Sequence, residues 1–128
     1  MFPVLFVLQA LLQSPAVIDG DTLHDNRRGY DYRLHGIDTP ETERAKCDAE
    51  RQLGLVASAR VAELLAGAEA VVAFPSHDPR GRSRWPTDGF GRRLARIEID
   101  GRDLGGILLA EGLAKPYDGG EHPDWCGQ

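Results

Sequence analysis

The sequence predicts an α+β domain, mainly β, in which a five-stranded barrel packs against two helices. Short segments that alternate apolar and polar residues between turn residues predict the strands. Two segments with apolar residues at helical spacing predict the helices, one long and one near the C-terminus. Five strands with two intervening helices fit the small barrel called the OB-fold.

The composition is that of one soluble globular domain. The chain has 128 residues, 41% of them hydrophobic and 27% charged. Its formal charge of −5 argues against a wide nucleic-acid-binding surface, since such surfaces make many Lys and Arg contacts with phosphates. It does not exclude an enzyme that holds one phosphate beside a metal. A cluster of six arginines predicts a local basic rim on an acidic body: Arg80, Arg82, Arg84, Arg92, Arg93 and Arg96.

Residues 1–15 form an apolar N-terminal segment, and we assign residues 16–128 to the domain. The run from Met1 to Leu12 is apolar except for Gln9 and is too short to span a bilayer. It resembles the apolar region of an export signal, although no basic residue precedes it. We therefore expect a secreted or periplasmic protein. The alternative is a cytoplasmic protein in which this segment leads into the first strand.

Two strands are predicted next, over Val17–Leu23 and Tyr30–Ile37, joined by a polar turn that ends at Gly29. By the two-residue period of a strand, Asp19 and Asp21 share one face. Like charges so placed are costly unless a cation or an arginine lies between them.

A helix is predicted from Asp48 to Leu65, ended by a left-handed Gly67, with its apolar face packed on the sheet. Its polar neighbours are interpreted as a solvated face: Glu43, Arg44, Lys46, Glu50 and Arg51. A short buried strand follows at Val71–Phe74. The strand Leu94–Asp100 and a second helix, Leu104–Glu111, complete the pattern, with Asp103 as N-cap and Gly112 at the end.

The segment Pro75–Thr87 has no periodicity, which is typical of a functional or exposed loop. Its arginines and Trp85 are candidates for contacts with phosphates and bases. A solvated loop with Trp85 packed on the barrel is the alternative. The neighbours His77 and Asp78 lack further ligands, and we do not interpret them as a metal site.

Three short stretches carry chemistry. Arg33 lies on the second strand, and Asp38 and Glu41 flank a turn fixed by Pro40. The stretch Asp19-Gly20-Asp21 adds carboxylates, and Asp88–Arg93 adds glycines and arginines. Carboxylates for a hard cation, one more for water and two arginines for a phosphate predict metal-assisted phosphodiester chemistry.

These stretches, in this order, resemble the staphylococcal-nuclease-like (thermonuclease) family over about residues 16–117. The resemblance implies that the calcium ligands are Asp21, Asp38 and the carbonyl of Thr39. It implies that the catalytic residues are Arg33, Glu41 and Arg92. The run Gly112–Tyr117 resembles the end of the family domain, which makes Lys115 and Tyr117 candidates for substrate binding. Phe90 departs from the family, which has a tyrosine there.

The resemblance implies a monomeric, Ca²⁺-dependent nuclease that acts on single-stranded or frayed DNA or RNA. With an ordinary pKa of about 4, Glu41 would be a weak base and would act mainly by placing a water. The alternative function is a non-catalytic OB-fold module that binds nucleic acid or protein. Residue roles also have alternatives: Arg33 as an ion-pair partner of Asp19 or Asp31, and Arg93 in place of Arg92.

The two cysteines, Cys47 and Cys126, leave two readings open. In an oxidising compartment they would form a disulfide between the start of the first helix and the C-terminal tail. Otherwise they are two reduced thiols. They are too few for a structural zinc site without nearby histidines.

Overall fold

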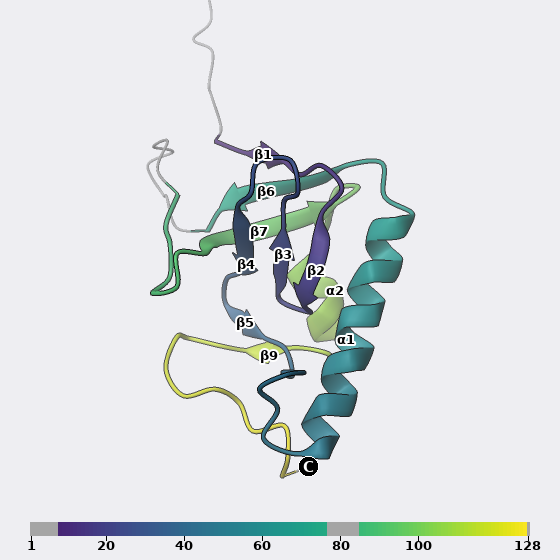
Figure 1. Ribbon diagram of the computed structural model, residues 1–128, viewed down its shortest axis with the longest axis vertical. Coiled ribbons are helices and arrows are strands. Elements are labelled where there is room, and N and C mark those ends of the chain that lie inside the picture. The colour runs from purple at the N-terminus through teal and green to yellow at the C-terminus, as the bar shows by residue number, and fades with distance from the viewer. Residues whose placement is uncertain (1–7, 77–84, 128) are drawn as a thin grey trace, which may run out of the picture.

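The structure is a computed structural model that describes residues 8–76 and 85–127 (Figure 1). Arg80, Arg82, Arg84 and the pair His77–Asp78 lie outside these residues, as does the start of the apolar N-terminal segment. No helix in the described part of the chain combines the length and apolar character needed to cross a membrane.

The α+β architecture is confirmed, with a strongly bent sheet and two helices (Figure 1). The main sheet has the strand order β1-β6-β7-β4-β3-β2, and β8 pairs with β7. All its neighbours are antiparallel except β4 and β7, which are parallel. Its strands are β1 (Ala10–Leu11), β2 (Ala16–Asp19), β3 (Thr22–His24), β4 (Asp31–Leu34), β6 (Val71–Pro75), β7 (Arg93–Ile99) and β8 (Arg102–Asp103). A small second sheet pairs β5 (Ile37–Asp38) with β9 (Lys115–Pro116).

Two of the predicted strands are each broken by a turn. The predicted strand Val17–Leu23 is a hairpin, because Val17 pairs with Leu23 and the chain reverses between β2 and β3. The prediction that Asp19 and Asp21 share a strand face is therefore wrong: Asp21 lies in the turn. The predicted strand Tyr30–Ile37 breaks at Gly36, whose φ of +82° is a left-handed conformation that favours glycine.

The core lies between the sheet and α2 (Leu104–Ala110). Its largest fully buried side chains include Tyr32, Leu23, Ile97, Leu104 and Leu108. Asp103 caps α2 as predicted, accepting a hydrogen bond from the backbone N–H of Gly106. Tertiary packing stabilises this short helix, which contains two glycines with poor helix propensity.

The long helix α1 (Asp48–Ala66) lies beside β2 and buries a narrower face than predicted. Ala57 and Val61 are buried, whereas Val56, which was predicted to pack on the sheet, is exposed. The helix ends at Gly67 as predicted, but with a φ of −95°. The prediction of a left-handed cap there is wrong.

A glycine brings α1 close to the turn that follows β5. A Cβ at Gly54 would lie 2.6 Å from the carbonyl oxygen of Glu41, so only glycine fits at this point of the helix. Gly20, in the β2–β3 turn, is similarly close to Ala57 and Thr39. The first half of α1 therefore backs both turns that carry the predicted acidic residues.

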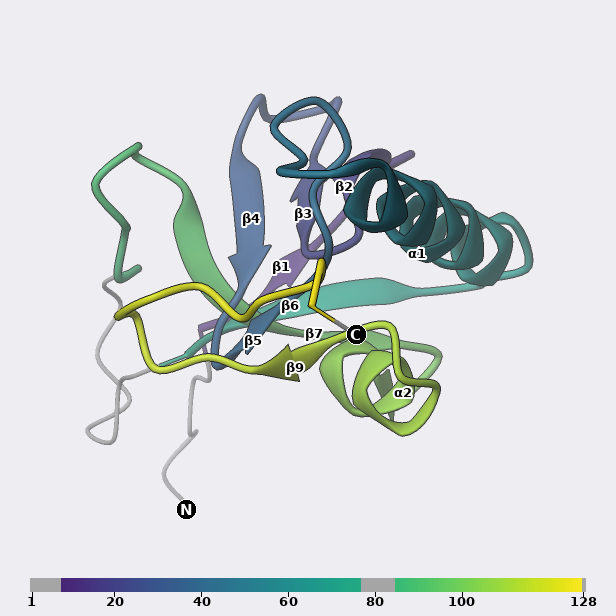
Figure 2. The same cartoon turned by 90° about the horizontal axis from the view of Figure 1, so that it is seen from below.

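Both ends of the described chain join the fold. Ala10 pairs with Ala73 of β6, and Ala10 and Leu12 are buried, so part of the predicted N-terminal segment belongs to the packed sheet. At the other end, the structure joins Cys47 and Cys126 in a disulfide, with their Cα atoms 6.1 Å apart. Figure 2 shows the last segment leaving β9, turning back and reaching the start of α1.

Candidate active site

The predicted site residues surround one pocket of about 550 Å³. The β2–β3 turn, β4, β5, the turn before α1 and the Asp88–Arg92 loop all contribute to its lining. Five of the six predicted catalytic and metal-binding residues line it: Asp21, Arg33, Asp38, Glu41 and Arg92. The sixth, Thr39, is fully buried behind the pocket wall.

Arg33 is the buried cation of this site. Its Nη2 donates to Asp21 Oδ2 at 3.4 Å and to Asp38 Oδ1 at 3.2 Å. Its Nη1 donates to the carbonyl oxygens of Leu34 at 2.9 Å and Ile37 at 3.2 Å. The alternative ion-pair partners that the sequence offered, Asp19 and Asp31, are not the ones observed in the described structure. Four contacts fix the guanidinium between β4 and β5.

Asp21 holds the two turns of the site together. Its Oδ2 accepts from the backbone N–H of Thr39 at 3.2 Å, and its Oδ1 accepts from the hydroxyl of Thr22 at 3.0 Å. The hydroxyl oxygen of Thr39 itself is buried without a hydrogen-bond partner among the described residues. The β2–β3 turn and the turn after β5 are thereby locked to each other.

Asp38 is nearly inaccessible and has partners on both oxygens. Oδ1 is 3.1 Å from His122 Nδ1 and also accepts from Arg33, while Oδ2 accepts from Trp125 Nε1 at 3.4 Å. Burial, followed by the charge of Asp21, raises the pKa of the Asp38 carboxyl above its usual value.

Glu41 lines the same pocket, and its backbone N–H donates to Glu50 Oε2 at 3.0 Å. Burial first, then the charges of Asp19, Asp21 and other nearby carboxylates, raise the pKa of Glu41 to about 7. This pKa lies above the ordinary value of about 4 that the sequence led us to expect. The physical reason is partial burial of the Glu41 carboxyl, together with the charges of the four nearby carboxylates Asp19, Asp21, Asp38 and Glu50.

The donor set of the pocket suits a hard cation. Asp21, Asp38, Asp19 and Glu41 present oxygens only, and burial together with mutual repulsion raises the pKa of the last three. Within the described residues, no three His, Cys, Asp or Glu side chains are grouped so as to hold a metal by themselves. A cation here would therefore need carbonyl, water or substrate oxygens in addition to the carboxylates.

The structure distinguishes the two neighbouring arginines. Arg92 lines the pocket, and its Nε donates to Asp88 Oδ2 at 2.6 Å. Arg93 points to an aromatic cluster, with its guanidinium carbon 3.6 Å from the Tyr30 ring centroid and 4.8 Å from that of Trp85. Trp85 packs edge-to-face on Tyr32, which fits the alternative in which it rests on the barrel.

The two candidate substrate-binding residues are placed differently. Tyr117 lines a shallow depression that adjoins the pocket and shares Arg33 and Arg92 with it. Its hydroxyl donates to the carbonyl oxygen of Gly120 at 3.0 Å. Lys115 lies outside the lining of both cavities, and its Nζ donates to the carbonyl oxygen of Asp124 at 3.0 Å.

Comparison with known proteins identifies the family. Residues 31–124 match the family described as "Staphylococcal nuclease homologue". The chain belongs to this family. Two relatives come from Bacillus subtilis (strain 168), the SPbeta prophage-derived endonuclease YokF and the endonuclease YncB, each 34% identical over 100 residues. The match covers 77% of this chain but only 31% and 44% of the relatives, so the chain spans less than half the length of either.

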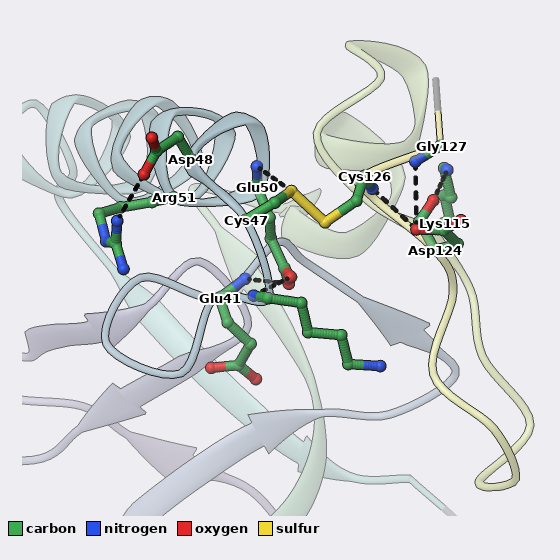
Figure 3. The surroundings of a disulfide bond; sticks show 10 residues. Glu41, Cys47, Asp48, Glu50, Arg51, Lys115, Asp124, Cys126 and Gly127 are labelled. Carbon is green, nitrogen blue, oxygen red and sulfur yellow. Dashed lines mark hydrogen bonds and ion pairs between the residues drawn. A yellow bond between two sulfur atoms is a disulfide. The ribbon is translucent and has the colours of Figure 1, made fainter.

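The structure adds residues that the family resemblance did not bring to the site. Glu50 was predicted to lie on a solvated face, and that prediction is wrong: it is 5% exposed. Its carboxylate accepts from the backbone N–H groups of Glu41 and Lys46, at 3.0 and 2.9 Å (Figure 3). A signal was available, because Glu50 lies three residues after the N-cap Cys47, where a glutamate commonly reaches back to bind backbone N–H groups.

His122 and Trp125 were likewise not predicted as site residues. Both contact Asp38 from the segment that follows β9. Contacts over more than eighty residues of sequence give no local pattern.

Replacing Glu50 with glutamine tests its support of the Glu41 turn. Glutamine presents an amide N–H₂ where one carboxylate oxygen stood, so one backbone N–H loses its acceptor. We expect the free energy of unfolding to fall by about 1–3 kcal/mol, measured by urea denaturation. The matched control is Asp48→Asn on the same helix, because the Asp48 side chain is 96% exposed and pairs only with Arg51. That change should be close to neutral. Equal destabilisation by both changes would contradict the assigned role of Glu50.

Proposed function

We propose that this domain is a nuclease that hydrolyses phosphodiester bonds of DNA or RNA. The observation that carries the proposal is the convergence of Arg33, Glu41 and Arg92 on one pocket beside the buried pair Asp21 and Asp38. The family and the two endonucleases at 34% identity support it. The competing function, a non-catalytic binding module, gives no reason for these charged groups to be gathered and partly buried.

We further propose Ca²⁺ as the cofactor, held by Asp21, Asp38 and the Thr39 carbonyl. The mutual repulsion of the carboxylates and their all-oxygen donor set support a hard cation. When bound, the cation would offset the negative charge of a phosphate and anchor one of its oxygens.

The two arginines would hold the phosphate. Arg33 is fixed by four contacts, so its charge stays at the pocket floor without reorganisation. Arg92 is oriented by Asp88 through Nε, which leaves its terminal nitrogens for phosphate oxygens. Charge that develops on the phosphate in the transition state would meet donors from two sides.

Glu41 would place the attacking water and accept its proton. Figure 3 shows its carboxylate pointing away from Glu50, while its backbone N–H is tied to that residue. The water oxygen would form a bond to phosphorus, its proton would pass to Glu41, and the bond from phosphorus to the leaving oxygen would break. The leaving oxygen would take a proton from solvent.

We propose a monomer that acts on single-stranded or frayed substrates. The acidic formal charge of −5 and the compact pocket favour contact with a short stretch of backbone over a grip on a duplex. Of the two candidates for substrate contact, Tyr117 is the better placed, since it adjoins Arg33, with the guanidinium carbon 5.5 Å from its ring centroid. Lys115 is engaged with the C-terminal segment.

We propose a secreted or periplasmic location, supported by the Cys47–Cys126 disulfide and the apolar N-terminal segment. Thiol labelling of denatured, unreduced protein from its native compartment should then find no free thiols, and the same protein after reduction should label at both cysteines. Stoichiometric labelling before reduction would contradict an oxidising location.

Metal dependence is the first functional test. Purified protein incubated with single-stranded DNA should cleave it in the presence of Ca²⁺ and stop when a chelator is added, because the carboxylate pair alone repels the phosphate. Gel electrophoresis of the DNA measures this. Equal cleavage with the chelator present would rule out the metal mechanism.

Substitutions separate catalysis from binding. Glu41→Gln is nearly isosteric, so nucleotide affinity and fold should persist while turnover falls by roughly 100-fold or more. Arg33→Lys should also reduce turnover, because an ammonium lacks the planar pair of donors. Steady-state kinetics and filter binding measure the two effects.

The neighbouring arginine, Arg93, supplies the control for Arg92. Arg92→Ala should reduce turnover more than Arg93→Ala, because Arg93 faces the aromatic cluster and not the pocket. If Glu41→Gln degrades DNA at the wild-type rate and the arginine changes alter only affinity, the binding module is the correct function.

A further inference from the structure

The segment 117–126, here called the C-terminal clamp, connects β9 to the start of α1. It follows β9, the strand that pairs with β5, and β5 ends at Asp38. It is tied covalently at Cys126 to Cys47, the N-cap residue of α1, across 79 residues of sequence. Figure 2 shows it leaving β9 and turning back toward the start of α1.

Two side chains of the clamp contact the same carboxylate. Trp125 is 4% exposed, and its Nε1 donates to Asp38 Oδ2 at 3.4 Å. His122 Nδ1 lies 3.1 Å from Asp38 Oδ1, the oxygen that also accepts from Arg33. Both oxygens of the Asp38 carboxylate thus have partners, Oδ2 in Trp125 and Oδ1 in His122 and Arg33.

Contacts within the clamp hold these two side chains in position. The rings of Tyr117 and His122 stack at 4.6 Å and 15°. The ammonium of Lys115 lies 4.3 Å from the Trp125 ring centroid. Asp124 Oδ1 accepts from the backbone N–H groups of Cys126 and Gly127, at 2.8 and 3.2 Å (Figure 3). These contacts are short-range, and the disulfide is the link that attaches the far end of the clamp to the domain.

We propose that Trp125 and His122 are positioning residues that orient Asp38 for the cation, and that the Cys47–Cys126 disulfide maintains this orientation. The inference rests on the proposed function. Partners that hydrogen-bond to a ligating group fix its orientation, and their loss typically weakens metal binding by about 10- to 100-fold. Reduction of the disulfide frees the end of the clamp and so lowers the affinity of the site for its cation. The domain would then bind its cation well only where the disulfide forms.

Calcium binding by the folded protein tests the positioning role without an activity assay. Trp125→Phe keeps an aromatic ring and removes the N–H donor, and His122→Phe keeps a ring for stacking on Tyr117 and removes the nitrogen. Each should raise the Ca²⁺ dissociation constant measured by calorimetry by roughly 10-fold. The matched control is Trp85→Phe, because Trp85 packs on Tyr32 away from Asp38 and should leave the constant unchanged.

Terbium luminescence gives a second readout, because Tb³⁺ is a hard cation that an adjacent indole sensitises. Excitation of tryptophan should give terbium emission in the wild type and in Trp85→Phe but not in Trp125→Phe. Emission that persists in Trp125→Phe and is lost in Trp85→Phe would overturn the placement of the cation beside the clamp.

The disulfide is tested by reduction and by the double substitution Cys47→Ser with Cys126→Ser. Both should raise the Ca²⁺ dissociation constant by about the same factor as Trp125→Phe. Reduction should have a smaller effect in Trp125→Phe protein than in the wild type, since the two changes share the Trp125 contact with Asp38. Circular dichroism checks the fold of each protein. The single ring substitutions decide the matter if the double serine variant does not fold.

The outcomes separate the clamp from the proposed function. Wild-type protein that binds neither Ca²⁺ nor Tb³⁺ overturns both. Wild-type protein that binds Ca²⁺, with unchanged constants in Trp125→Phe, in His122→Phe and after reduction, overturns the clamp alone.

Discussion

The structure of the site depends on one buried guanidinium. Arg33 is almost completely removed from water, and a lone buried charge of this kind is strongly unfavourable unless it is paired. Asp21 in the β2–β3 turn and Asp38 at the end of β5 supply the pairing, and two backbone carbonyls accept hydrogen bonds from Nη1. The β2–β3 turn, β4 and β5 are therefore held in one arrangement. Because two carboxylates share one guanidinium, the cluster keeps an excess of negative charge.

A second group of contacts fixes the turn that carries Glu41. Glu50 binds its backbone N–H, and Gly54 lets the helix backbone come close to it. The disulfide attaches the same end of α1 to the C-terminal segment, whose Trp125 reaches Asp38. The start of α1 is thus connected to the two acidic residues on either side of the Pro40 turn. Support of this kind places polar groups with the precision that catalysis requires.

Most of the charged residues that line the pocket were predictable from the sequence, because their types and order are local patterns around short turns. The fold class, the α2 cap at Asp103 and five of the pocket residues followed from such patterns. The break at Gly20-Asp21 was not predicted, since the apolar alternation of Val17–Leu23 is the same whether the strand is continuous or folded into a hairpin. The burial of Glu50 depends on a tertiary contact with the Glu41 turn, which overrides the usual exposure of a glutamate at a helix start.

Which of the two arginines, Arg92 or Arg93, faces the pocket depends on tertiary contacts and cannot be read from the local sequence pattern. Arg92 and Arg93 are adjacent and chemically identical, so no propensity distinguishes them. Asp88 accepts from both the backbone N–H and the Nε of Arg92, which turns that side chain toward the pocket. The rings of Tyr30 and Trp85 attract the other guanidinium. The orientation of each arginine is therefore determined by tertiary contacts, with Asp88 for Arg92 and with Tyr30 and Trp85 for Arg93.

The electrostatics of the pocket fit the proposed cation-binding function better than a purely structural one. A raised carboxyl pKa means that the folded protein binds that proton more tightly than the unfolded chain does. Glu41 therefore lowers stability as the pH rises from its ordinary value of 4.5 through about 7. Asp19 and Asp38 are shifted in the same direction. If these carboxylates served only for packing, apolar side chains of similar size would do so without this loss of stability. A cation bound by the folded state would offset this repulsion and would stabilise the fold by mass action.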